Sequence, residues 1–132
     1  YSTNVTVTGT QGQAGALITL AVNDSGIYCA GHTRSDLVEA NSGPDDIFVA
    51  KFSEVEDLGS VTVNLDWVKH IGEISESVDG AAGVSEEAYG IVVDTSGIYV
   101  GGGTYSDLGE ENAGLMDKFV MKISTSDHSK AP

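Results

Sequence analysis

The sequence predicts an all-β fold made of two homologous units, each a four-stranded antiparallel sheet. The first observation is an internal repeat: residues 20–53 and 91–124 align without a gap at an offset of 71, with 18 of 34 paired positions identical. The second is a series of short, alternating apolar segments separated by glycine-containing turns, a pattern typical of strands. Such a repeat indicates stacked units that cannot bury their apolar faces alone.

The first unit begins with a predicted β-hairpin. The cluster Asn23-Asp24-Ser25-Gly26 has the residues that tight turns favour, and it separates two β-rich segments. Further strands follow after polar connections. The expected strands of this unit are 17–22, 27–31, 46–52, and 61–63 running toward 67–71.

The second unit repeats the same order. Its turn is Asp94-Thr95-Ser96-Gly97, and residues 73–84 are expected to form a loop because Gly80 and Gly83 interrupt any helical pattern. The expected strands are 89–93, 98–100 and 117–123. Polar connections are expected at 34–44, 53–59, 72–87 and 105–115, followed by a polar tail at 124–132.

The segment Asn4–Gly9 alternates like a strand but precedes the first full unit. Its position relative to the first unit is the same as that of 67–72 relative to the second unit. We therefore divide the chain into 1–16 (a strand of a preceding or neighbouring unit), 17–72 (the first unit) and 73–132 (the second unit, lacking its outer strand, and the tail). The first residue is not methionine and no signal-peptide pattern follows it. We expect the chain to be a piece of a longer protein.

The second unit is similar to the SBBP-type β-propeller repeat. The resemblance rests on residues 91–104, which read I-V-V-D-T-S-G-I-Y-V-G-G-G-T, and on residues 117–122, which read D-K-F-V-M-K. The first unit departs from the family pattern at Asn23 and Cys29, and Trp67 matches the family's outer-strand tryptophan there only. The resemblance covers most of residues 17–124, with connections longer than those of the family.

This resemblance implies that the two units are β-propeller blades. Such a blade is apolar on both faces, and closing a ring takes at least about four blades. Two blades alone leave apolar faces bare. We therefore expect the chain to belong to a larger propeller, made either by other blades of the same longer chain or by a homo-oligomer. In the oligomer, Asn4–Thr8 of one copy is expected to complete the second blade of a neighbour.

The charge and cysteine content narrow the possible partners. The net charge of −14 disfavours nucleic acid and anionic lipid as partners. The single cysteine, Cys29, lies in an apolar alternating run and is interpreted as a small buried hydrophobic residue. No apolar run approaches the length of a membrane span.

Candidate site residues are few. Asn4 and Asn23 begin N-x-S/T sequons and are candidate glycosylation sites, although Asn is also a natural turn residue. Tyr105 is an aromatic residue near a loop end, at the start of the predicted connection 105–115, and is a candidate ligand contact. The spacing of His32, His70 and His128 does not fit a metal site, so no metal ligand and no catalytic residue is assigned. The acidic loops leave calcium as an alternative, without an EF-hand pattern.

The sequence favours a non-enzymatic, extracellular or cell-surface β-propeller segment that serves as a structural or protein-interaction module. The first alternative is a propeller that binds carbohydrate, or another ligand with the help of calcium. An enzyme whose site is built from several blades is the third hypothesis. No cofactor is expected apart from calcium under the first alternative.

Overall fold

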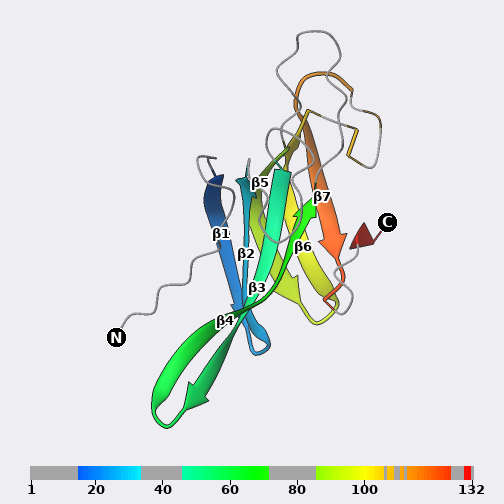
Figure 1. Ribbon diagram of the computed structural model, residues 1–132. Coiled ribbons are helices and arrows are strands. Elements are labelled where there is room, and N and C mark those ends of the chain that lie inside the picture. Colours follow the sequence, from blue (N-terminus) through cyan, green and yellow to red (C-terminus); the bar gives the residue numbers. More distant parts are fainter. Residues whose placement is uncertain are drawn as a thin grey trace.

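A computed structural model describes residues 15–33, 46–71, 86–105, 107–108, 111, 113–125 and 130–131, and these residues contain strands and no helix (Figure 1). No segment among them is therefore a candidate for a membrane-spanning helix. The strands are β1 (Gly15–Asn23), β2 (Gly26–Thr33), β3 (Asp46–Asp57), β4 (Ser60–Ile71), β5 (Glu86–Asp94), β6 (Gly97–Thr104), β7 (Asp117–Ile123) and β8 (Lys130–Ala131). This confirms the all-β prediction.

The strands form two antiparallel sheets in sequence order. Sheet 1 is β1-β2-β3-β4 and sheet 2 is β5-β6-β7-β8. The ladder registers of the two sheets coincide at the repeat offset, so that Tyr28 pairs with Lys51 and Tyr99 pairs with Lys122. The first hairpins are irregular at equivalent positions, between Leu17 and Thr19 in β1 and between Ala88 and Gly90 in β5.

Glycine opens the second strand of each hairpin because the neighbouring backbone leaves no room for a side chain. A Cβ at Gly26 would lie 2.5 Å from the carbonyl oxygen of Phe52, and one at Gly97 would lie 2.9 Å from that of Ile123. Both glycines also have positive φ values, 153° and 159°. The glycine of the Ser-Gly pair that marks the repeat in the sequence is thus required by the approach of the third strand.

β3 and β4 are longer than the sequence predicted. Residues 53–59 were expected to form a polar connection, but the ladder continues from Ser53 opposite Asn64 to Asp57 opposite Ser60. The chain turns at Leu58 and Gly59, whose φ values are 50° and 81°. The result is a two-stranded ribbon that extends away from both sheets (Figure 1). We call residues 53–66 the ribbon; β7 of sheet 2 ends at Ile123 without such an extension.

The two sides of each sheet can be defined by equivalent residues. We call the side that bears Cys29, or its repeat counterpart Val100, the front, and the side that bears Tyr28 or its counterpart Tyr99 the back. Alternation along the strands assigns the other side chains, because successive residues point to opposite faces.

Sheet 2 packs with its front against the back of sheet 1. β5 contacts β1, β2 and β3. The shared core contains residues from the back of sheet 1 and from the front of sheet 2: Tyr28, Ala30, Ile47, Val49 and Ile71, with Ala88, Ile91, Ile98, Val100 and Ile123. The sheets are therefore stacked in the same orientation, and equivalent faces do not meet.

A second apolar cluster lies on the front of sheet 1. It consists of Cys29, Phe48, Ala50, Phe52 and Val68, all buried. Both sides of sheet 1 are therefore apolar, as expected for a sheet with a neighbour on each side.

The end of the chain differs from the prediction. Residues 124–132 were expected to form a polar tail, but Lys130–Ala131 form the short strand β8, which pairs with Lys122 and Ile123 of β7. Sheet 2 therefore has a two-residue fourth strand where sheet 1 has the long β4. The predicted strand at Asn4–Gly9 and the connection at 34–44 lie outside the described residues.

Candidate functional site

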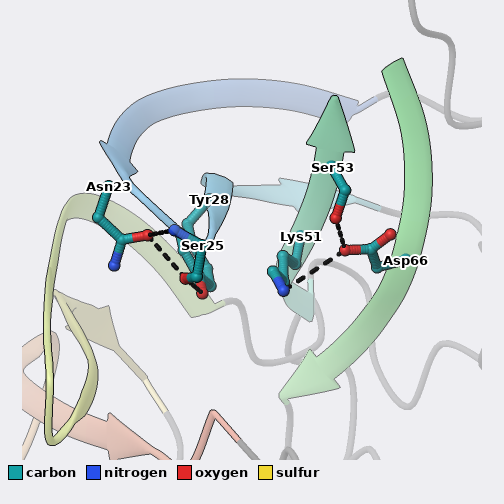
Figure 2. Close-up of polar contacts among 6 residues, drawn as sticks. All are labelled: Asn23, Ser25, Tyr28, Lys51, Ser53 and Asp66. Carbon is teal, nitrogen blue, oxygen red and sulfur yellow. Dashed lines mark hydrogen bonds and ion pairs between the residues drawn. The ribbon is translucent and has the colours of Figure 1, made fainter. Parts of the chain in front are cut away.

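The turn of each hairpin is held by a side chain that accepts hydrogen bonds from its own loop. In the first hairpin, Oδ1 of Asn23 accepts from the backbone N–H of Ser25 at 2.9 Å and from its hydroxyl at 2.7 Å (Figure 2). The Ser25 hydroxyl also shares a hydrogen bond with the Tyr28 hydroxyl at 2.7 Å. The turn is therefore stabilised by side chains, and Tyr28 of β2 is hydrogen-bonded to it.

The second hairpin has the same arrangement with a carboxylate. Oδ1 of Asp94 accepts from the N–H and the hydroxyl of Ser96, each at 2.7 Å, and from the N–H of Gly97 at 3.1 Å. The Ser96 hydroxyl lies 2.8 Å from the Tyr99 hydroxyl. The pKa of Asp94 is lowered, mainly by the hydrogen bond from the Ser96 hydroxyl and then by the one from the Ser96 backbone N–H. The positive charge of Lys122 lowers it further.

A lysine lies beside each of these tyrosines. The Lys51 amino group is 5.9 Å from the Tyr28 ring centroid, and the Lys122 amino group is 5.5 Å from that of Tyr99. In sheet 1 Lys51 also pairs with Asp66 at 3.5 Å, and Asp66 accepts a hydrogen bond from the Ser53 hydroxyl (Figure 2). In the described part of the chain a carboxylate therefore lies near each lysine: Asp66 of β4 beside Lys51, and Asp94, whose pKa Lys122 helps to lower.

Asp66 stands where the ribbon begins. The register between β3 and β4 shifts between Lys51 and Phe52, which pair with Trp67 and Leu65, so Asp66 is the extra residue of a bulge. Its carboxylate connects β4 to Lys51 and Ser53 of β3. The sequence reasoning missed Asp66, because nothing in its neighbourhood distinguishes it from the other acidic residues.

The two glycosylation candidates have different outcomes. Asn23 is exposed at the hairpin turn, so a glycan there has space. Its oxygen has the same turn role as that of Asp94, which accounts for a polar residue at this position without any modification. Asn4 lies outside the described residues.

Tyr105 is exposed just after β6, beside a second exposed tyrosine, Tyr89. The Tyr89 hydroxyl donates a hydrogen bond to Glu87, and the Lys118 amino group lies 5.2 Å from its ring centroid. The hydrogen bond to Glu87 raises the pKa of Tyr89. We call Glu87, Tyr89, Tyr105, Met116 and Lys118 the tyrosine patch.

A glycine makes room for the tyrosine patch. A Cβ at Gly103 would lie 2.6 Å from Sδ of Met116 and 3.5 Å from Cε2 of Tyr89. Sδ of Met116 in turn accepts from the Tyr89 hydroxyl and the Lys118 amino group, both at 3.6 Å. The sequence reasoning found Tyr105 but missed Tyr89 and Lys118. The signal that identifies Lys118 is divergence between the repeats, since Ile47 occupies its place in sheet 1.

Buried acidic groups lie at the ends of the strands opposite the hairpin turns. Asp46 and Glu86 are completely buried. Nδ1 of the buried His70 lies 3.6 Å from Oδ2 of Asp46, and the Thr104 hydroxyl donates to Glu86 at 3.5 Å. Asp117, the counterpart of Asp46, accepts from the N–H of Ala113 at 2.7 Å. The two equivalent aspartates, Asp46 and Asp117, thus each contact a polar group at the start of the third strand of their sheet.

The described residues contain no group of three or more His, Cys, Asp or Glu side chains that could hold a metal ion. His32 is partly buried in β2, and His128 lies outside the described residues. Cys29 is buried, and burial raises the pKa of its thiol to about 11. It occupies the position of Val100, in agreement with its interpretation as a buried hydrophobic residue.

No protein-family model matches this chain, and no curated protein matches its sequence.

Proposed function

We propose that this chain is a non-enzymatic structural and protein-interaction module, made of two β-propeller blades of a larger or oligomeric propeller. Its mechanism is geometric: stacked sheets form a rigid frame, and the turns and connections at their ends make the contacts. The SBBP-type resemblance of residues 91–104 and 117–122 is part of this proposal.

The single observation that carries the proposal is the front-to-back stacking of two equivalent sheets. A self-contained sandwich pairs two inner faces and exposes two outer faces. Here one sheet contributes its front and the other its back, so the contact joins non-equivalent faces, as it does between successive units of a stack. Repeated stacking of equivalent sheets about an axis is the construction principle of a propeller.

An extracellular or cell-surface location is part of the proposal. The net charge of −14 favours solubility and disfavours binding to nucleic acid or anionic lipid. The exposed Asn23 sequon is compatible with a glycan at the hairpin turn. The proposed partners are other blades of the same longer chain or of other copies, together with further extracellular proteins.

The experiment combines unfolding with a ligand screen. A structural module should unfold in one cooperative urea transition, because the sheets share one core. Its melting temperature should not respond to EDTA, to calcium or to a panel of soluble oligosaccharides. A melting temperature that rises with a sugar would contradict the proposal and support the alternative below.

The alternative is a carbohydrate-binding propeller, and the tyrosine patch is the observation that favours it. Tyr89 and Tyr105 are exposed aromatic side chains, and Glu87 and Lys118 provide a hydrogen-bond acceptor and a donor beside them. Aromatic rings with neighbouring polar groups suit the apolar faces and hydroxyl groups of sugars. A glycan array tests this directly, with Tyr105→Ala as the variant and the exposed Val55→Ala as its matched control. Binding that is lost only in Tyr105→Ala would support the alternative.

A further inference from the structure

The front of β1 is exposed, although its repeat counterpart forms the contact between the sheets. Leu20 and Val22 on this strand are 57% and 72% exposed. Their counterparts on β5 are Ile91, which is only 7% exposed, and Val93, which packs against the shared core. β5 is the strand of sheet 2 that lies on β1, β2 and β3. The rest of the front of sheet 1, with Cys29, Ala50 and Phe52, is buried, so the open apolar surface on this side is that of β1. Among the described residues, β1 therefore carries the same kind of docking side chains with no sheet packed on them.

The back of sheet 2 shows the complementary situation. Val120 is 79% exposed, whereas its counterpart Val49 is completely buried against sheet 2. Val92 is 65% exposed, whereas its counterpart Ala21 packs against the shared core. Tyr99, held by Ser96 and approached by Lys122, occupies the position of Tyr28, which is buried in that core.

We infer that the front of β1 in one copy docks on the back of sheet 2 in a second copy of this chain, head to tail. Leu20 and Val22 are the docking residues of one copy, and Val92, Tyr99 and Val120 form the surface of the other. The template is the internal contact between sheets 1 and 2, in which counterparts of all five residues already take part. The inference rests on the proposed function, because it extends the same stacking operation from one chain to the next.

The interface is heterologous, because it joins two different surfaces. It is confined to the half of sheet 2 nearer the β5–β6 turn. At the other end the repeats diverge, since Lys118 replaces the buried Ile47 and belongs to the tyrosine patch. A second copy seated on Val92 and Val120 therefore need not cover Tyr105, which lies beyond the end of β6.

The test is sedimentation velocity over a concentration series, at physiological ionic strength so that the net charge of −14 is screened. The unmodified chain should form dimers and longer species as concentration rises. A front variant (Leu20→Asp with Val22→Asp) and a back variant (Val92→Asp with Val120→Asp) should each remain monomeric. We expect each apolar side chain lost from the contact to weaken association about tenfold.

Mixing the two variants is the decisive step. Each retains one intact surface, so an equimolar mixture should form a 1:1 dimer that cannot grow. Val55→Asp, an exposed valine on the ribbon, is the control and should associate like the unmodified chain. Circular dichroism melting of every variant shows whether its sheets are still folded.

The remaining outcomes would overturn the inference. They are an unmodified chain that is monomeric throughout the series, variants that associate normally while folded, or a mixture that stays monomeric. None of these results affects the ligand screen of the proposed function. Conversely, sugar binding at the tyrosine patch would remove the proposed function without preventing the variants from pairing. If a variant is unfolded, its single substitutions in the same mixing experiment decide the question.

Discussion

The backs of the two sheets carry equivalent tyrosine and valine residues, but these residues are buried in sheet 1 and at least partly exposed in sheet 2. In sheet 1, Tyr28 and Val49 are buried because sheet 2 lies on them. In sheet 2, the counterpart Val120 is exposed, and Tyr99 is only partly buried. The difference teaches that burial in this molecule is set by the neighbouring sheet rather than by the residue itself. An apolar side chain on a repeated unit is core or surface depending on its place in the stack.

Where the repeats differ in residue type, they differ in local chemistry as well. Lys51 pairs with Asp66 on β4, whereas Lys122 contributes to lowering the pKa of Asp94 in the β5–β6 turn. Asn23 replaces that turn carboxylate in sheet 1. In sheet 2 the carboxylate near the lysine therefore lies in the β5–β6 turn, whereas in sheet 1 it lies at the base of the ribbon.

The largest expected effect comes from the same substitution at the two equivalent positions Ile91 and Leu20. Ile91→Asp places a carboxylate in the shared core and should lower the free energy of unfolding by about 3–5 kcal/mol. Leu20→Asp changes an exposed side chain and should stay within about 0.5 kcal/mol. Urea denaturation at low protein concentration measures both. Equal effects at the two positions would contradict the front-to-back stacking.

A smaller effect is expected on the backs of the sheets. Val49→Ala removes two buried methyl groups and should cost about 2 kcal/mol, because a cavity remains beside sheet 2. Val120→Ala, its exposed counterpart, should change stability by less than about 0.5 kcal/mol. Thermal and urea unfolding provide the comparison. A large loss for Val120→Ala would mean that this face is already covered.

The Asp66 contact tests how the ribbon is attached. Asp66→Ala removes the partner of Lys51 and the acceptor of Ser53, and should lower stability by about 0.5–1 kcal/mol, since both charged side chains are partly exposed. The loss should shrink in about 1 M salt, where such pairs are screened. Glu54→Ala, on the exposed ribbon, is the control. An effect that is insensitive to salt would point to bulge geometry rather than charge.

The smallest effect concerns pH. The pKa of Asp94 is lowered in the folded chain from its ordinary 3.8, so its contribution is present above that value and disappears as pH falls through the folded pKa. The melting temperature of Asp94→Asn should therefore fall less steeply below about pH 4 than that of the unmodified chain. The melting temperature of Asn23→Asp should fall more steeply over the same pH range than that of the unmodified chain. Melting curves between neutral and acidic pH compare the three proteins, and parallel curves would contradict the shared turn role.

Local chemistry explains which elements could be predicted. The hairpins were recognisable because a glycine turn and alternating apolar residues lie within a few positions of each other. The ribbon was not, because Glu54, Glu56 and Asp57 resemble a solvated connection until their partners on β4 are known. In the same way, β8 forms by pairing with Lys122 and Ile123, and the polar sequence of residues 124–132 contains no local pattern that predicts a strand.

The candidate site was predictable only in part. Tyr105 is recognisable in the sequence as an aromatic residue near a loop end, and the structure places it near Tyr89, which in turn contacts Glu87, Met116 and Lys118. These residues come from three separate stretches of the chain, so their proximity is a product of sheet pairing. Comparing the two repeats position by position would have identified Lys118 opposite Ile47 as a departure.

The sequence by itself determined the repeat, the hairpins and the equivalence of their registers, because turns and alternating patterns act between residues close in the chain. Only the tertiary structure decided which apolar faces are buried. Both sides of each repeated sheet carry apolar side chains, so the pattern alone does not choose between them. The choice is made by the neighbour, which removes water from one face and leaves the equivalent face of the other sheet exposed.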